Sequence, residues 1–181
     1  MIYTVECSFA DPASERPWND FYSLQKLPAL ISVSGFRTSQ RFQALSASCP
    51  TYLAVHSIDG LEVLLGEEYR QKGGGNFARW QPHITDWRRN LYAGLARAPA
   101  IAADETLLVS DVGAEPLVAL GLTPAAMHAV ALDNSPGRRW LAQCPRGADV
   151  QAPSLPPGVH CYAPMTAQLT NARGAGRDAS K

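Results

Sequence analysis

The chain has 181 residues, of which 46% are apolar, and its 16 Lys and Arg residues balance its 16 Asp and Glu residues. This apolar share supports a folded core and excludes extensive disorder. A neutral chain without a basic run has no general attraction for nucleic acid, and no apolar stretch is long enough to cross a bilayer. We therefore expect a folded protein with neither a nucleic-acid nor a membrane partner.

The first residues, MIYTVECSFAD, lack the basic region and cleavage site of a secretory signal, which predicts a cytoplasmic location. The cysteines are widely spaced and form no CxxC pair, whereas structural zinc requires closely spaced ligand pairs. We therefore predict no metal site. The four residues are interpreted as reduced, buried apolar side chains: Cys7, Cys49, Cys144 and Cys161.

The first part of the chain alternates between strand-like and helix-like patterns. Strands are predicted where apolar residues recur at every second position: residues 2–9, 36–42 and 51–58. Helices are predicted at 18–33 and 61–71, with a polar loop at 11–17 before the first and Gly35 after it. The buried face of the first helix is expected to contain Phe21, Leu24, Leu27, Pro28 and Ile31.

A glycine-rich break at 72–76 precedes a Trp- and Arg-rich segment that ends in a predicted strand at 84–92. The order of elements to this point is β-α-β-β-α-β, as in a ferredoxin-like unit. After an alanine-rich linker, further strands and one short helix are predicted: strands at 106–112, 127–132, 138–144 and 158–169, and a helix at 115–120. This division predicts three parts: a ferredoxin-like unit at 1–95, a condensed β-rich second half at 96–170 and a flexible tail at 171–181.

These patterns predict an α+β fold of ferredoxin-like antiparallel sheets, with helices on one face and the second half a condensed repeat of the first. Such a sheet leaves its other face uncovered, and apolar burial at about 25 cal/mol per Å² favours the pairing of two sheets. The two halves could pair within one chain, or a barrel could close with another subunit. A self-complementary dimer is the simplest arrangement.

One stretch resembles a known group of proteins. It contains an aromatic pair at Phe21 and Tyr22, a basic residue at Lys26 two positions before Pro28, and then a Gly-Phe pair before a strand. This pattern resembles the dimeric α+β-barrel superfamily, and in particular its EthD-like and muconolactone-isomerase-like groups. The resemblance implies a homodimer of the dimeric α/β-barrel type. EthD-like proteins typically carry a histidine where this chain has Lys26, so the sequence departs from their pattern there.

Three titratable side chains are candidate catalytic groups. Burial near a cavity can lower the pKa of a lysine, so Lys26 could be a base or a nucleophile; alternatively it is a solvated residue at a helix end. His56 is expected to point away from Leu53 and Val55, into a barrel or dimer cavity, and to transfer a proton there; alternatively it is an interface histidine. His83 is a further candidate.

Five other side chains are candidate substrate-binding groups. Trp80 and Trp87 would suit a flat apolar or aromatic ligand, and Tyr52 lies on the same strand face as the histidine at position 56. Arg88 could hold a carboxylate or phenolate, and Arg41 could reach the same pocket from its strand. The alternative is a Trp/Arg cluster packed at a subunit interface.

No GxSxG motif, GxGxxG motif or metal-triad spacing occurs in the sequence, so we predict no cofactor. The favoured function is a cofactor-independent small-molecule enzyme of isomerase, lyase or oxygenase type. It would act by proton transfer on a small apolar or aromatic metabolite. The alternative is a non-catalytic ligand-binding or assembly module with the same fold.

Overall fold

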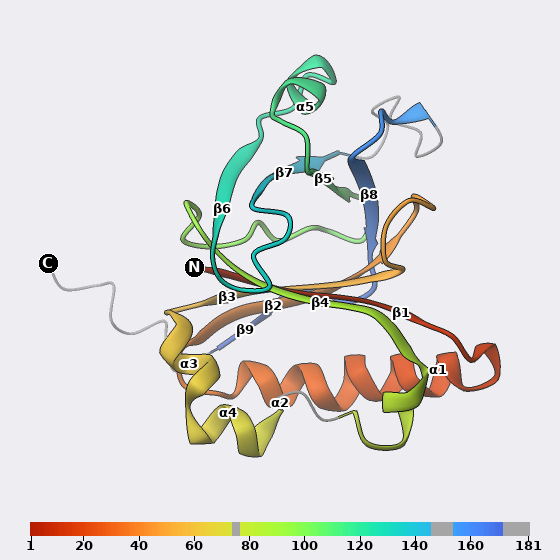
Figure 1. The fold of residues 1–181 in the computed structure, drawn as a ribbon, viewed down its shortest axis with the longest axis vertical. Helices are drawn as coiled ribbons and strands as arrows, with labels where there is room; N and C mark the ends of the chain where they lie inside the picture. Colours follow the sequence, from red (N-terminus) through yellow and green to blue (C-terminus); the bar gives the residue numbers. More distant parts are fainter. Residues whose placement is uncertain (74–76, 146–153, 172–181) are drawn as a thin grey trace, which may run out of the picture.

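A computed structural model of the chain describes residues 1–73, 77–145 and 154–171. Eight antiparallel strands close into a barrel within this one chain (Figure 1). The first four strands pair in the order β2-β3-β1-β4: β1 (Ile2–Phe9), β2 (Phe36–Ala44), β3 (Tyr52–Ile58) and β4 (Ile84–Ala93). The next four pair in the order β6-β7-β5-β8: β5 (Thr106–Ser110), β6 (Ala125–Leu132), β7 (Arg138–Cys144) and β8 (Val159–Pro164).

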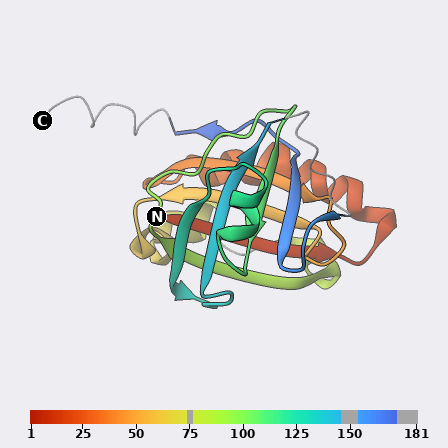
Figure 2. The same ribbon diagram turned by 90° about the horizontal axis from the view of Figure 1, so that it is seen from above.

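Two contacts between these sets close the barrel. β4 pairs with β6, and β8 pairs with β2, while the short strand β9 (Leu169–Thr170) adds to β2. In Figure 2 the two sets of strands cross each other, with the barrel interior between them. The predicted α+β antiparallel barrel with a condensed second half is therefore confirmed, and it closes within one chain. The homodimer and the division into parts at residue 95 stay predictions, and residues 172–181 of the predicted tail lie outside the described part.

The helices that cover the first four strands lie below them in Figure 1. A continuous helical segment consists of α1 (Pro12–Phe21), the π-helical turn η1 (Tyr22–Lys26) and α2 (Leu27–Ile31). Three shorter elements follow along the chain: α3 (Leu61–Leu65), α4 (Glu67–Lys72) and the 3₁₀ turn η2 (Ala78–His83). The helix α5 (Glu115–Ala119) packs on the outer face of the second half. None of the described helices has the length and apolar character of a membrane span.

The predicted loop at 11–17 is wrong, because the first helix already begins at Pro12. Asp11 is its N-cap, and the Asp11 carboxylate accepts a hydrogen bond from the backbone N–H of Ala13. Proline is well suited to the first helical position because its missing N–H would have no partner there. The polar, proline-containing stretch is therefore a helix start and not a linker.

The predicted buried face of this helix is also wrong at two positions. Leu24 is 73% exposed and Pro28 is exposed. Leu27 is buried as predicted, and the other buried positions follow a spacing of four: Trp18, Tyr22, Lys26 and Leu30. Pro28 has no N–H to donate to the carbonyl of residue 24, and the neighbouring Leu27 N–H donates to Tyr22, five residues back. This π turn widens the helix locally, so side chains four apart stay on one face.

The strands separate two apolar regions of the first half. The helix side of the sheet contains Tyr52 and Ala54 in one buried cluster, whereas Leu53 and Val55 belong to the cluster inside the barrel. The expectation that His56, on the face opposite Leu53 and Val55, points into the barrel is therefore wrong, because the helices cover that opposite face. Every residue of β3 is buried, so its alternation cannot distinguish a helix-covered face from a barrel interior.

A charged network crosses the barrel interior. Glu6, which is fully buried, accepts a hydrogen bond from Arg139 Nη2 at 2.9 Å. Arg139 Nε donates to Asp111 at 2.8 Å, and Arg88 Nε lies 3.6 Å from the second Glu6 oxygen. Removing one partner from a buried ion pair leaves the other charge without compensation.

Substitution Arg139→Met should therefore lower the free energy of unfolding by about 3–5 kcal/mol, because the fully buried Glu6 carboxylate loses its hydrogen-bonded partner. Urea denaturation at pH 7 measures this change. The double variant Glu6→Gln/Arg139→Met should recover much of the loss. Arg70→Met, which breaks the exposed pair with Glu67, is the matched control and should leave the transition unchanged. An equal change in the free energy of unfolding in Arg139→Met and Arg70→Met would contradict the proposed role of the network.

Candidate active site between helices and sheet

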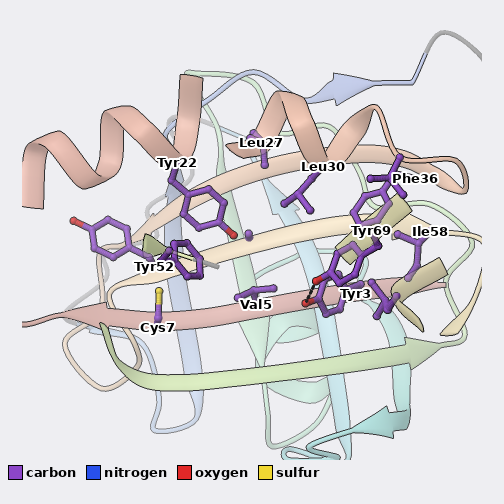
Figure 3. Close-up of a cluster of buried hydrophobic side chains, with 14 of the residues drawn as sticks. Tyr3, Val5, Cys7, Tyr22, Leu27, Leu30, Phe36, Tyr52, Ile58 and Tyr69 are labelled. Carbon is purple, nitrogen blue, oxygen red and sulfur yellow. Dashed lines mark hydrogen bonds between the residues drawn. The ribbon is translucent and has the colours of Figure 1, made fainter. Parts of the chain in front are cut away.

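The candidate site lies on the helix side of the sheet, where aromatic side chains of β1, the first helix and α4 meet (Figure 3). An almost filled inner cavity of about 10 Å³ has a mainly aromatic lining: Tyr3, Val5, Tyr22, Lys26, Leu30, Tyr69, Gly73, Phe77 and Trp87. Beside it, an open depression of about 330 Å³ is lined by two segments of helix: Phe21, Gln25, Lys26 and Ala29 from one, and residues 70–73 from the other. Lys26 and Gly73 line both spaces.

Lys26 connects the depression with the aromatic interior. Its side chain follows the buried face created by the π turn, and the residue is only 6% exposed. The ammonium donates a hydrogen bond to the Gly73 carbonyl at 2.8 Å and lies 4.2 Å from the centroid of the Phe77 ring. Burial lowers the pKa of Lys26 to about 8, because the charged form loses hydration. A minor fraction of this amine, about a tenth at pH 7, is therefore neutral, compared with less than a thousandth for a free lysine.

Two tyrosines stand at the inner end of the site. The hydroxyls of Tyr3 and Tyr69 are 3.1 Å apart and share a hydrogen bond (Figure 3). Burial raises the pKa of Tyr3 and of Tyr22 well above that of a free tyrosine. Tyr3, Tyr22 and Tyr69 lie in the same buried cluster. Tyr3 and Tyr22 remain phenols at neutral pH and could donate a hydrogen bond to an oxygen of a bound molecule.

His56 lies in the helix-side layer, beneath the inner cavity, and not in the barrel interior. Its Nδ1 is 2.9 Å from Ser39 Oγ, and its ring is stacked on Tyr3 with 5.4 Å between centroids. Nε2 is buried and has no hydrogen-bond partner among the described residues. Burial, and then the charge of Lys26, lower the pKa of His56 to about 3. The imidazole is therefore neutral at physiological pH, and its predicted catalytic role stays a prediction.

Arg41 and Tyr52 belong to a neighbouring polar network under the first helix. The fully buried Arg41 donates to the Asn19 amide oxygen and to Ser23 Oγ, each at 2.8 Å, and its guanidinium lies 4.1 Å from the Tyr22 ring centroid. The Tyr52 hydroxyl accepts from Asn19. It also donates to the Glu15 carboxylate at 2.7 Å. Arg41 therefore places a positive charge directly behind one wall of the cavity.

The structure does not bring the remaining predicted residues together at this site. His83 and Trp80 line a separate open depression of about 350 Å³, with Asp11 and Arg79. Trp87 lines the inner cavity, whereas its neighbour Arg88 points into the barrel toward Glu6. Adjacent residues of one strand face opposite sides, so Trp87 and Arg88 could not both line one pocket.

Sequence reasoning missed several residues that line the inner cavity: Tyr3, Tyr22, Tyr69 and Phe77. Tyr22 and Lys26 are four residues apart, and this spacing places them on one helix face if the helix is taken to begin at Pro12. Tyr3 was visible only as one apolar residue of a strand. Tyr69 and Phe77 come from segments whose placement against the first helix depends on tertiary packing.

No protein-family model matches this sequence, and no curated protein matches it. Two solved structures are similar in fold. An anthrone oxidase-like protein superposes with a TM-score of 0.58 over 94% of this chain and 92% of its own, at 11% identity. A candidate monooxygenase from Lactobacillus acidophilus NCFM gives a TM-score of 0.51 over 94% of this chain and 96% of its own, at 8% identity. At these identities the likeness establishes the α+β-barrel fold alone.

The neutral, buried His56 should make the protein sensitive to acid. The unfolded chain binds a proton at this histidine below about pH 6.5, whereas the folded chain does so only below about pH 3. The free energy of unfolding should therefore fall by about 1.4 kcal/mol per pH unit between pH 6 and pH 4 through this one group. Urea titrations at several pH values measure the slope in the wild type and in His56→Gln.

The free energy of unfolding of His56→Gln should be lower than that of the wild type at pH 7. Between pH 6 and pH 4 it should fall less steeply than in the wild type, because the variant lacks the histidine that takes up about one proton on unfolding. His128→Gln, at an exposed position on β6, controls for the removal of a histidine and should keep the wild-type slope. Parallel curves for the wild type and His56→Gln would contradict the buried, neutral state of His56.

Proposed function

We propose that this chain is a small-molecule enzyme that begins its reaction by removing a proton from a small, flat, mostly aromatic substrate, with the neutral amine of Lys26 as the base. The observation that carries this proposal is the position of Lys26. The residue is nearly buried, its pKa is lowered to about 8, and it lines both the open depression and the aromatic inner cavity. A general base works best when its pKa is near the working pH.

The lining of the depression supports an acidic aromatic substrate. Phe21 offers an apolar face, whereas Arg70 and Lys72 at the rim are each paired with a glutamate of α4, Glu67 and Glu68. Behind the cavity wall, the buried guanidinium of Arg41 lies against Tyr22. Positive charge near a forming phenolate, enolate or carbanion stabilises it relative to the neutral substrate. A phenolic or enolisable ring compound fits this arrangement better than a neutral aliphatic one.

The names of the two structural neighbours, anthrone oxidase-like protein and monooxygenase, favour oxidation by molecular oxygen as the later step. In that reaction a ring CH₂ group loses its first proton to Lys26, and the carbanion reacts with O₂. The CH₂ group becomes a carbonyl, and one oxygen atom leaves as water. Isomerase or lyase chemistry would share the first step and differ only in the fate of the carbanion.

The inner cavity also favours a second candidate function. Its volume of about 10 Å³ leaves no space for a substrate ring, as expected if the aromatic cluster only stabilises a binding or assembly module. The homodimer and the cytoplasmic location remain proposals in either case. Proton exchange into a bound compound distinguishes the two functions, because a module without a base would catalyse none.

The test uses a panel of anthrones and hydroxynaphthalenes, with hydrogen–deuterium exchange at the acidic carbon measured by NMR without oxygen, and oxygen uptake measured separately. We expect exchange with a kcat/KM that rises with pH through about 8 and then levels. Lys26→Met should reduce exchange about 10²–10⁴-fold, and Lys26→Arg should fail equally because it keeps the charge but not the base. Arg138→Met, an exposed cation away from the site, should retain full activity.

Stability provides a check that needs no substrate. Because the pKa of Lys26 is about 8 in the folded chain and about 10.5 when unfolded, the unfolded state binds more protons between these values. The free energy of unfolding should therefore rise with pH from about 8 to about 10 in the wild type, and less so in Lys26→Met.

The proposed function would be contradicted if hydrogen–deuterium exchange is unchanged in Lys26→Met, or if no compound of the panel shows exchange.

A further inference from the structure

One row of side chains on the first helix lines two depressions in turn. Residues four apart lie on the same face of a helix. Ala13 and Pro17 line the open depression of about 350 Å³. The row continues along the depression of about 330 Å³ that Lys26 also lines: Phe21, Gln25 and Ala29. In Figure 1 the helix is flanked along this length first by the yellow-green turn η2 and then by α4. The two depressions therefore follow each other along one face of the helix.

Two aromatic rings stand between the depressions. Phe21 lines the depression beside Lys26, whereas Trp80 lines the other one. The centroids of the Phe21 and Trp80 rings are 4.6 Å apart, which is direct contact between aromatic side chains. Trp80 is only 8% exposed, and its backbone N–H donates to the Phe77 carbonyl at 3.1 Å. Burial and this backbone bond hold the Trp80 ring in place, so the pair forms a partition between the two depressions.

The partition sets the length of the space around Lys26. From Phe21 to Ala29 the helix rises by about 12 Å, roughly the length of three linearly fused benzene rings. Pockets for small molecules have volumes of about 300–1,000 Å³, so the depression beside Lys26 lies near the lower end of this range. A longer rigid compound would meet the aromatic partition. Without the partition, the second depression would extend this space to about twice its volume.

We propose that Trp80 determines the size of the substrate: packed against Phe21, it closes one end of the Lys26 depression and limits the substrate to about three linearly fused rings. Its role is to exclude longer compounds, and such a repulsive contact is a common source of specificity. The inference rests on the proposed function for the kind of compound that binds. The size limit itself acts on binding, so it can be measured without catalysis.

The experiment measures Kd by isothermal titration calorimetry for hydroxylated linear arenes of two, three and four fused rings. The wild-type chain should bind the four-ring compound at least ten times more weakly than the three-ring compound. In Trp80→Ala this difference should fall below three-fold, because the two depressions become continuous. Trp140→Ala, which removes a tryptophan from the outer face of the second half, should keep the wild-type difference. Equal wild-type affinities for the two compounds, or failure of the three-ring compound to bind, would overturn the proposal.

A second variant opens the same partition from the helix side. Phe21→Ala should also reduce the difference in Kd, and it decides the question if circular dichroism shows that Trp80→Ala is unfolded. The wild-type ratio of Kd values in a folded Trp80→Ala or Phe21→Ala variant would overturn the proposal.

Hydrogen–deuterium exchange separates this inference from the proposed function. Size-selective binding without exchange would contradict the role of Lys26 as a base and leave the partition in place. Exchange that requires Lys26, together with an unchanged Kd ratio in the folded variants, would overturn the size limit alone.

Discussion

Closure of the barrel by the β4–β6 and β8–β2 pairings is the constraint on which the other features depend. A four-stranded antiparallel sheet covered by helices on one face would expose its other face and both edges to water. Pairing with β5–β8 satisfies the backbone groups of both edges and buries the open face. One consequence is that β1, β2 and β3 are almost entirely buried on both faces, so polar side chains on either side of them are taken out of water.

The polar groups on the two sides of this sheet are compensated in different ways. In the barrel interior, Glu6 is compensated by an ion pair with Arg139. On the helix side, Lys26 and His56 respond to burial by a shift of pKa toward the neutral form. Arg41 is instead held by amide and hydroxyl oxygens and by aromatic faces. This difference makes the helix side the place where proton transfer is chemically accessible.

The two sides of the sheet differ in how the fold assembles them. The surroundings of Lys26 are formed by the helical layer and one face of the sheet, and the aromatic lining comes from segments far apart in the sequence. On the other side, the loop between β2 and β3 is fixed to β8, where His160 meets Asp111 at the end of the charged barrel network. This second arrangement depends directly on barrel closure, because β8 would have no neighbour in β2 if the two halves were separate.

The sequence by itself determined the strands, since their two-residue alternation and turn residues are local, and β1 was predicted at its observed bounds. It also identified Lys26 as a candidate group, from its place before Pro28. Tertiary structure decided the rest. The face of β3 that meets the helices could not be predicted, because both faces are apolar and buried. The buried face of the first helix depended on the π turn at Tyr22–Lys26, within which Leu24 is exposed. The contacts of Lys26 with Phe77 and Gly73, and of His160 with Asp111, join residues many positions apart, and only tertiary packing brings such residues together.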